Sequence, residues 1–333
     1  RMNNGVSLFV LISTSAVLDF SDVLGTAVTD LVKKVLIAGS GKIRRLGVCR
    51  VTDLGTQTAG AGPAAEALAA IPLAQALVEN EFGTFKRPVS IVLEGHGWAG
   101  TVTASTDIRA ANTAGNIAVC VGQDPAVAAL NAGFTKYAAV GSLIAEAATG
   151  QVNESVGWVQ NGNLTDAARG AWLNAYLSSN LPASDYELDH DQLHDKGYTF
   201  AKQIAGTEGV YFNDAPTCTP QTNMVSFYRL AETQDKAARE IRSALVEHIN
   251  RTVEINPDTG QLAARWIAFF ESEARSALDQ MVADEELSGH QVYIDPAQDV
   301  LGTQTVEVFY EIVPFGAANA IKASIAMVST LTA

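Results

Sequence analysis

The sequence predicts an α/β protein: a mixed-sheet sandwich core with flanking helices, and β-strand arms at both termini. Two short apolar runs, 88–93 and 116–122, have the length and composition of strands that are buried on both faces of a sheet. Alanine-rich stretches with helical spacing alternate with them, which is typical of a sheet packed between helices. The last stretch, 304–333, instead alternates apolar and polar residues, as half-buried strands do.

Composition limits the classes of function. The chain has 333 residues, of which 17% are charged and 47% are apolar, and this length can form a large core or two domains. The net charge of -14 argues against direct nucleic-acid binding, which needs basic stripes. No run reaches the roughly eighteen apolar residues of a membrane helix, so membrane insertion is not expected. The cysteines Cys49, Cys120 and Cys218 include no CxxC pair and are expected to be buried, reduced thiols.

The first half of the chain is expected to alternate strands with helices. A β-prone arm or first strand covers 6–17; the apolar run 6–12 could also pass for the core of a signal peptide, but interleaved Ser, Thr and β-branched residues favour a strand. The expected elements that follow are a helix over 19–36, strands over 46–51, 88–93 and 116–122, and helices over 63–80 and 125–150. Pro72 could kink or split the helix in which it lies.

Two glycine-rich motifs resemble nucleotide-binding motifs, but the residues around them do not fit such sites. Gly39-Ser40-Gly41-Lys42 resembles the tail of a phosphate-binding loop, but Leu36 stands where the first glycine belongs and Ile43 where Ser or Thr belongs. Gly95–Gly100 follows a strand and has the spacing of the dinucleotide fingerprint. The β-branched run 101–103 follows where a helix should begin, so a turn is favoured. A dinucleotide-dependent α/β enzyme using the Gly95–Gly100 loop remains the alternative function.

The most polar segment, 185–195, is the other candidate site. His190 and His194 have the helical spacing of metal ligands, with carboxylates close by. A solvated loop is favoured because Pro182 and Ser184 precede the segment and no HExxH is present, while a carbohydrate- or metal-binding module stays open. We assign no catalytic, cofactor-binding or metal-binding residue, and expect no enzyme activity.

Two amphipathic helices are predicted in the region 223–286, over 227–249 and 262–282. Leu245 in the first and Trp266 in the second belong to their apolar stripes. We expect both helices to pack on the α/β unit.

The carboxyl-terminal stretch predicts two strands. In the first, Val306, Val308, Tyr310 and Ile312 share one face. The second begins at Ile321, and it carries the residues expected to form a pairing arm: Ile321, Ala323, Ile325, Met327, Val328 and Leu331. A β-prone, uncharged strand is an aggregation hazard unless another strand pairs with it. It therefore either completes the chain's own sheet or completes the sheet of a neighbouring subunit.

The second half of the chain resembles the sheath proteins of contractile phage tails and related injection machines. The patterns that carry the resemblance are, in order, Val156-Gly157-Trp158-Val159 with Asn161-Gly162; Lys196-Gly197-Tyr198-Thr199-Phe200; Ala205 to Asp214; the helix from Arg229 through Asp235-Lys236-Ala237-Ala238 to Glu247; and the final strand, Val313-Pro314, strand arrangement. The resemblance covers roughly 140–333, and the first 140 residues match only in general layout.

This resemblance implies a structural protein of a virion, assembled in the host cytoplasm, without a cofactor. Sheath subunits form six-fold rings that stack helically around a tail tube, and their contraction drives the tube through the host envelope. The implied partners are further copies of the chain, the tube protein, and baseplate and tail terminator proteins. The implied organisation is an arm over 1–18, a core over 19–303, and a strand pair with an inter-subunit arm over 304–333.

Overall fold

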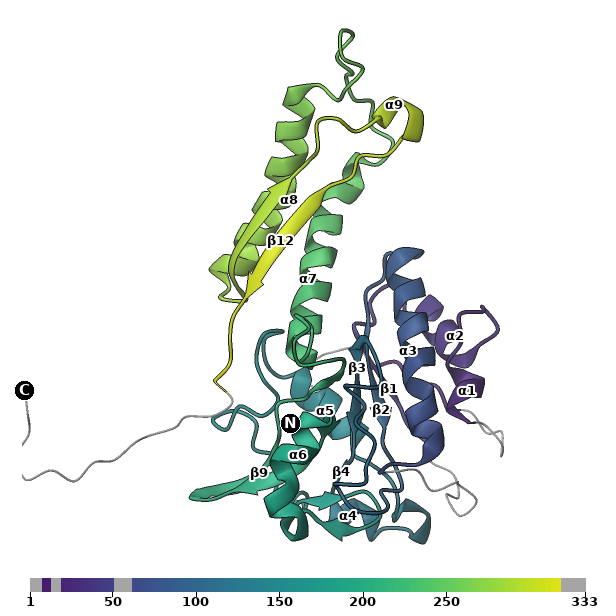
Figure 1. Cartoon of the computed structure of the whole chain (residues 1–333), viewed down its shortest axis with the longest axis vertical. Coiled ribbons are helices and arrows are strands. Elements are labelled where there is room, and N and C mark those ends of the chain that lie inside the picture. The colour runs from purple at the N-terminus through teal and green to yellow at the C-terminus, as the bar shows by residue number, and fades with distance from the viewer. Residues whose placement is uncertain (1–7, 13–18, 51–61, 319–333) are drawn as a thin grey trace, which may run out of the picture.

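The computed structural model describes residues 8–12, 19–50 and 62–318, which form two lobes connected through one long helix, α7 (Figure 1). The first lobe is a sheet with helices on both faces. The second lobe consists of two helices covered by a β-hairpin. The predicted mixed α/β class with flanking helices is therefore confirmed, whereas the predicted terminal arms lie outside the described residues, apart from 8–12.

A central sheet organises the first lobe. Its strands are β1 (Arg45–Val48), β2 (Ser90–Glu94), β3 (Ala114–Cys120), β7 (Tyr198–Thr199) and β10 (Thr217–Cys218). The first three are parallel neighbours in the order β1-β2-β3, and they correspond to the three strands predicted from the apolar runs. β7 lies parallel to β3, and β10 lies antiparallel to it.

Helices and small sheets surround the central sheet. The helices are α1 (Phe20–Val23), α2 (Leu31–Ala38), α3 (Ala65–Gly83), α4 (Pro125–Ala128), η2 (Ala132–Phe134), α5 (Val140–Ala147), η3 (Ala183–Asp189) and α6 (His190–Asp195). A small sheet contains β4 (Gly122–Gln123), β5 (Tyr176–Leu177) and β6 (Leu181–Pro182), and a hairpin contains β8 (Ala201–Ile204) and β9 (Thr207–Phe212).

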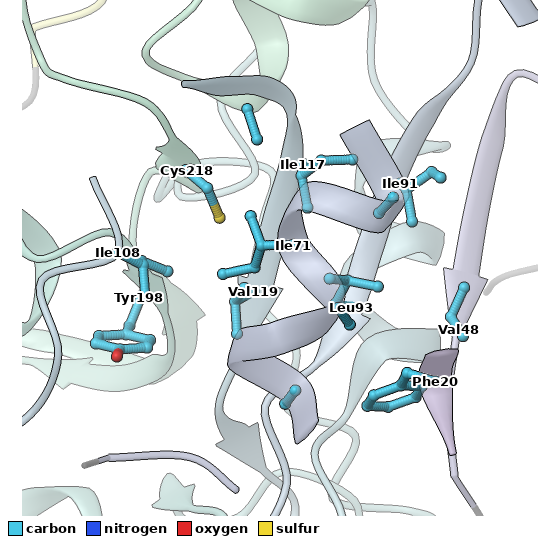
Figure 2. Packing of buried hydrophobic residues seen from close by; sticks show 14 of the residues in the cluster. Phe20, Val48, Ile71, Ile91, Leu93, Ile108, Ile117, Val119, Tyr198 and Cys218 are labelled. Atoms are coloured by element: carbon cyan, nitrogen blue, oxygen red, sulfur yellow. The ribbon is translucent and has the colours of Figure 1, made fainter. Parts of the chain in front are cut away.

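Both faces of the central sheet are buried, which explains the uninterrupted apolar runs. In β2, Ile91 and Leu93 enter the core beneath α3, whereas Val92 enters the core shared with α5. β3 alternates in the same way. Figure 2 shows Ile71 of α3 beside Val119 and Ile117 of β3, in the larger of these cores.

The helix predictions over 19–36 and 125–150 were wrong where side-chain hydrogen bonds to the backbone interrupt the helical pattern. The expected helix over 19–36 is two helices, because the Asp30 carboxylate accepts the Ala27 amide at 2.8 Å and closes a turn between them. The expected helix over 125–150 is also interrupted: the Gln123 amide donates to the carbonyls of Thr135 and Tyr137 and holds that segment as a loop. Pro72, in contrast, lies inside one continuous α3.

The second lobe has its own small core. Its elements are α7 (Tyr228–Leu245), η4 (Val246–His248), α8 (Ala264–Ala283), β11 (Leu287–Tyr293), α9 (Val300–Thr303) and β12 (Phe309–Pro314). α7 packs on β2 and β3 of the first lobe, but α8 packs mainly on α7 and β11. The prediction that both helices pack on the α/β unit is therefore correct for α7 and wrong for α8, because the hairpin supplies α8 with a separate apolar surface.

The hairpin confirms the predicted face of the first carboxyl-terminal strand. Val308, Tyr310 and Ile312 pack against the core of the second lobe, while Phe309 and Val313 are exposed. The partner of β12 is β11, in antiparallel register. The predicted second strand lies outside the described residues. Within the described ranges, no helix combines the length and the apolar character needed to cross a membrane.

Candidate functional site

The Gly95–Gly100 loop is packed against the protein's own backbone. A Cβ atom at Gly95 would lie 2.6 Å from Val121 Cγ1 and 2.9 Å from the Cys120 carbonyl oxygen, so this glycine permits close packing of the chain. Trp98 is buried, with its ring edge-on to Tyr198 at 5.2 Å. The segment after the loop is a turn, and the helix start that a dinucleotide site requires is not formed there.

Titratable groups beside this loop are tied to the backbone. Glu94, at the end of β2, accepts the amides of Arg50 at 2.6 Å and Ala138 at 2.9 Å. Burial raises the pKa of Glu94 to about 7, although both hydrogen bonds oppose this shift. Burial also lowers the pKa of His96 to about 4, so the imidazole that lies 2.8 Å from Glu66 Oε1 is neutral at pH 7. These groups stabilise the ends of β1 and β2.

The two histidines of the polar segment have separate partners. His190 Nε2 lies 3.0 Å from the Ala183 carbonyl, and its ring packs on Phe200. His194 Nδ1 lies 2.9 Å from Asn213 Nδ2, and its ring stacks on Phe227. The segment that carries them is η3 and α6 rather than a loop. In the described part of the chain, no group of three or more His, Cys, Asp or Glu side chains is placed to hold a metal ion.

Asn213 and Asp214 bring distant segments of the chain together. Asn213 Oδ1 accepts the Phe200 amide at 2.9 Å, and Asn213 Nδ2 donates to the Tyr198 carbonyl at 3.0 Å. Asp214 Oδ1 accepts the Ser155 hydroxyl at 2.8 Å. Arg229 Nε lies 3.4 Å from Asp214 Oδ2, and both side chains are at least nine-tenths buried. We call Ser155, Gly157, Tyr198, Phe200, Asn213, Asp214 and Arg229 the Asn213–Asp214 junction.

Two further contacts complete this junction. A Cβ atom at Gly157 would lie 2.8 Å from the Phe212 carbonyl oxygen and 3.0 Å from the Asn213 carbonyl carbon, so only glycine fits without displacement of the backbone. Arg229 Nη1 also lies 3.5 Å from the Phe315 carbonyl, directly after β12. The sequence patterns that carry the resemblance are therefore in mutual contact, from the 156–159 turn to the last described strand.

The face of α7 that covers the sheet is unusually polar. Asp235 accepts the Ser90 hydroxyl at 3.1 Å, and Arg45 forms a two-pronged ion pair with Glu232, in which Nη2 lies 2.7 Å from Oε2. Arg239 donates to the Pro88 carbonyl at 3.4 Å. Burial raises the pKa of Asp235 to about 6, against the opposing effects of Arg239 and Ser90. Sequence reasoning missed this site, although charges at 229, 232, 235 and 239 repeat at helical spacing and indicate one polar face.

The hairpin and the run 8–12 carry exposed apolar side chains. On the outer face of the hairpin, the rings of Tyr293 and Phe309 stack across the strands at 5.2 Å, and Val313 is exposed. Residues 8–12 (LFVLI) are all exposed and form no strand within the described residues. The predicted arm residues Ile321, Ala323, Ile325, Met327, Val328 and Leu331 lie outside the described residues.

The chain is therefore an α/β protein in which the buried polar side chains of the Asn213–Asp214 junction hold together segments that are distant in the sequence. Residues 55–216 match the model of the DUF2586 N-terminal domain, and residues 228–332 match the model of the DUF2586 C-terminal domain. Together these matches cover most of the chain, which belongs to the DUF2586 family. The boundary between them falls immediately before α7. No curated protein sequence matches the chain.

Solved structures similar to this chain include baseplate and sheath proteins. A chain of the anti-feeding prophage baseplate is 11% identical, with a TM-score of 0.49, over 78% of this chain and 66% of that one. A chain of a contracted extracellular injection-system sheath complex, PVC, is 11% identical, with a TM-score of 0.47, over 73% and 65%. The sheath tail protein of Desulfitobacterium hafniense is 9% identical, with a TM-score of 0.36, over 72% and 52%. This chain thus spans about two thirds or less of each.

Proposed function

We propose that this protein is the structural subunit of a contractile tail sheath, and that it is not an enzyme. In this role it forms stacked hexameric rings around a tail tube, and contraction of the rings drives the tube through the host envelope. Its partners are other copies of itself, the tube protein, and the baseplate and terminator proteins of a virion assembled in the host cytoplasm.

The observation that carries this proposal is the contact between the patterns on which the sheath resemblance rests. Segments that resemble a family by coincidence have no reason to meet in space. Here Gly157, Phe200, Asp214 and Arg229 come from different patterns and are connected through the Asn213–Asp214 junction. The resemblance therefore extends to a single structural unit, which supports its functional implication.

Strand addition between subunits is the second part of the proposal. β12 has β11 along one edge, and in the described part of the chain no strand pairs with its other edge. The exposed run 8–12 and the β-prone stretch 321–333 supply strands that could pair with another subunit. Backbone hydrogen bonds provide the attraction, and alternate side chains set the register.

The energetics of strand addition favour a lattice. Pairing of a ten-residue arm gains roughly 5–10 kcal/mol at about 1 kcal/mol per hydrogen bond. Ordering its backbone costs about 1–2 kcal/mol per residue. One arm is therefore marginal by itself, and many arms in a ring gain from high effective concentration.

Negative-stain microscopy of the purified protein tests this function. We expect hollow cylinders of uniform width from the full chain, and only folded monomers or small oligomers after deletion of residues 321–333. Ile325→Lys should prevent cylinders as the deletion does, whereas Ser324→Lys, on the opposite face of the predicted strand, should be better tolerated. Long cylinders from the truncated chain would show that the arm is not needed between subunits.

A further inference from the structure

One end of the first lobe carries exposed apolar side chains and exposed lysines. Ile37, Phe82 and Phe85 are exposed by 41%, 42% and 43% at the ends of α2 and α3. Lys34 of α2 is exposed, as are Lys42 and Lys86, which follow the ends of α2 and α3. We call these six residues the basic face. Within 31–44 and 79–87, Glu79 is the only exposed carboxylate, so the lysines give these helix ends a positive charge on a chain with a net charge of -14.

Lys33 and Arg87 hold the Phe85 ring of the basic face in place. The buried Lys33 Nζ lies 3.7 Å from the centre of the Phe85 ring, and the Arg87 guanidinium lies 4.7 Å from it. Both cations pair with the buried Glu81, so Phe85 is fixed by a charged network beneath the surface. A preorganised aromatic surface loses little conformational entropy when it binds a partner.

A complementary surface projects from η3. Leu188 is fully exposed, and Asp185, Glu187 and Asp191 are exposed around it. We call these four residues the acidic knob. A single exposed leucine is ordinary, but this one stands among carboxylates on a short, supported turn. The contact between His190 Nε2 and the Ala183 carbonyl, at 3.0 Å, joins the ends of the turn.

The basic face and the acidic knob lie at opposite ends of the first lobe. The Ala64 amide donates to the His96 carbonyl, which places the start of α3 at the carboxyl end of β2 and the Gly83 end of α3 at the amino ends of the strands. η3 instead packs on β5, β6 and β8. β5 pairs with β4, immediately beyond the carboxyl end of β3. Figure 1 shows α3 running along the sheet, and α6, which follows η3, in the lower part of this lobe.

We infer that the acidic knob of one copy of this chain docks on the basic face of a second copy. Leu188 lies against Phe82 and Phe85 in this contact, and its neighbouring carboxylates meet Lys34 and Lys42. The two surfaces differ, so the contact is head-to-tail. In a dimer, one copy retains a free acidic knob and the other retains a free basic face. Repetition of the contact therefore gives a closed ring or a helix. The inference rests on self-association within the proposed function, and it adds a contact between subunit cores that is independent of the terminal arms.

Charge reversal tests the contact in the full chain. Asp185→Lys with Glu187→Lys reverses the knob, and Lys34→Glu with Lys42→Glu reverses the face. Lys86 is left unchanged because its Nζ donates to the Gly83 carbonyl at 2.6 Å and caps α3. By sedimentation velocity at low salt, each reversed variant should self-associate about tenfold more weakly than the original chain. Asp258→Lys, in a distant turn, is the control and should associate normally.

Combining the two charge reversals distinguishes a specific contact from a general effect of charge, because only a specific contact should be restored. A mixture of the knob-reversed and face-reversed variants should associate again, as should one chain that carries all four substitutions. If neither restores association, or if the single reversals have no effect, the contact is wrong.

A photo-crosslinking residue at position 188 identifies the partner surface directly. We expect crosslinks to peptides that contain Phe82 or Phe85 of a second copy. Such crosslinks in oligomers that never form cylinders would support this contact while contradicting the sheath function. Cylinders whose crosslinks lie elsewhere would support the sheath function and overturn this contact.

Discussion

Ser90 Oγ donates a hydrogen bond to Asp235 Oδ2 over 3.1 Å, and this contact fastens the start of β2 to the middle of α7. Asn116 of β3 approaches both oxygens of the same carboxylate at 3.3 Å. Because Asp235 is only 5% exposed, these neutral donors must replace much of its hydration. The charge state of Asp235 therefore affects one of the contacts that attach α7 to the sheet, beside those of Glu232 and Arg239.

Stability should depend on pH through Asp235. Burial raises its pKa from 3.8 to about 6 in the folded protein, so the folded state binds the proton more tightly than the unfolded state. This contribution to the free energy of unfolding is complete below pH 3.8 and is lost as pH rises through 6, amounting to about 3 kcal/mol. Asp235→Asn removes it. The stability of the Asn variant relative to the original chain should therefore rise between pH 4 and pH 7 in urea titrations, and a difference independent of pH would contradict the assignment.

Gly157→Ala should destabilise the protein by about 1–3 kcal/mol, because the new methyl group meets backbone atoms of Phe212 and Asn213 within 3.0 Å. Gly141→Ala is the matched control. It lies within α5 with nothing within 4 Å of the new methyl group, and it should stabilise by about 0.5–1 kcal/mol. Thermal melting of both variants measures the contrast. Equal melting temperatures would show that the junction tolerates an extra methyl group.

Arg229→Met should cost about 3 kcal/mol or more, because it leaves Asp214 buried without its cation. Arg169→Met removes an exposed ion pair with Asp166 and should cost less than about 1 kcal/mol. Chemical denaturation gives both values. A small effect of Arg229→Met would mean that solvent reaches Asp214 and that the junction is weaker than its geometry indicates.

Leu278→Asp should unfold the second lobe, because Leu278 is fully buried between α7 and the hairpin. Hydrogen exchange should then increase in α8, β11 and β12 while the central sheet keeps its protection. Leu245 and Trp266, which the sequence suggested as core anchors, are only half-buried, so aspartate at those positions should have smaller effects. Exchange that rises equally in both lobes would show that they unfold as one unit.

The double change His190→Ala with His194→Ala should lower the melting temperature through lost ring packing on Phe200 and Phe227. Added zinc should not raise the melting temperature of the original chain, because the two imidazoles contact separate partners. Stabilisation by zinc that disappears in the double variant would restore the metal hypothesis.

The elements predicted best from the sequence are those whose pattern of apolar residues follows from burial. β2 and β3 are apolar on both faces, and β12 alternates because one of its faces covers a helix pair. Local patterns could not reveal which surface α8 would cover, since the apolar stripe of a helix fits a sheet or a hairpin equally well. The breaks near Asp30 and Gln123 were also missed, because side-chain hydrogen bonds to the backbone override the helical spacing there.

The candidate site was less predictable. The two conspicuous sequence motifs are Gly95–Gly100 and the pair His190 and His194. Both pack against other parts of the protein. Asp214 and Arg229 are ordinary residues in sequence, and they gain their role only when β9 and α7 meet. The exposure of Phe82, Phe85 and Leu188 likewise depends on tertiary packing, so neither the basic face nor the acidic knob could be predicted from local sequence patterns.

α7 belongs to two hydrophobic cores at once. Tyr228, at its start, lies in a core of the first lobe, whereas Ala237 and Ile241 lie in the core of the second. An unbroken helix that packs in both cores transmits force from one lobe to the other. It contains no break about which one lobe could rotate relative to the other. Force on the hairpin would therefore reach the sheet where Asp235 contacts Ser90 and Asn116, at the amino ends of β2 and β3. In the sheath proposed above, the two lobes of one subunit would then move together.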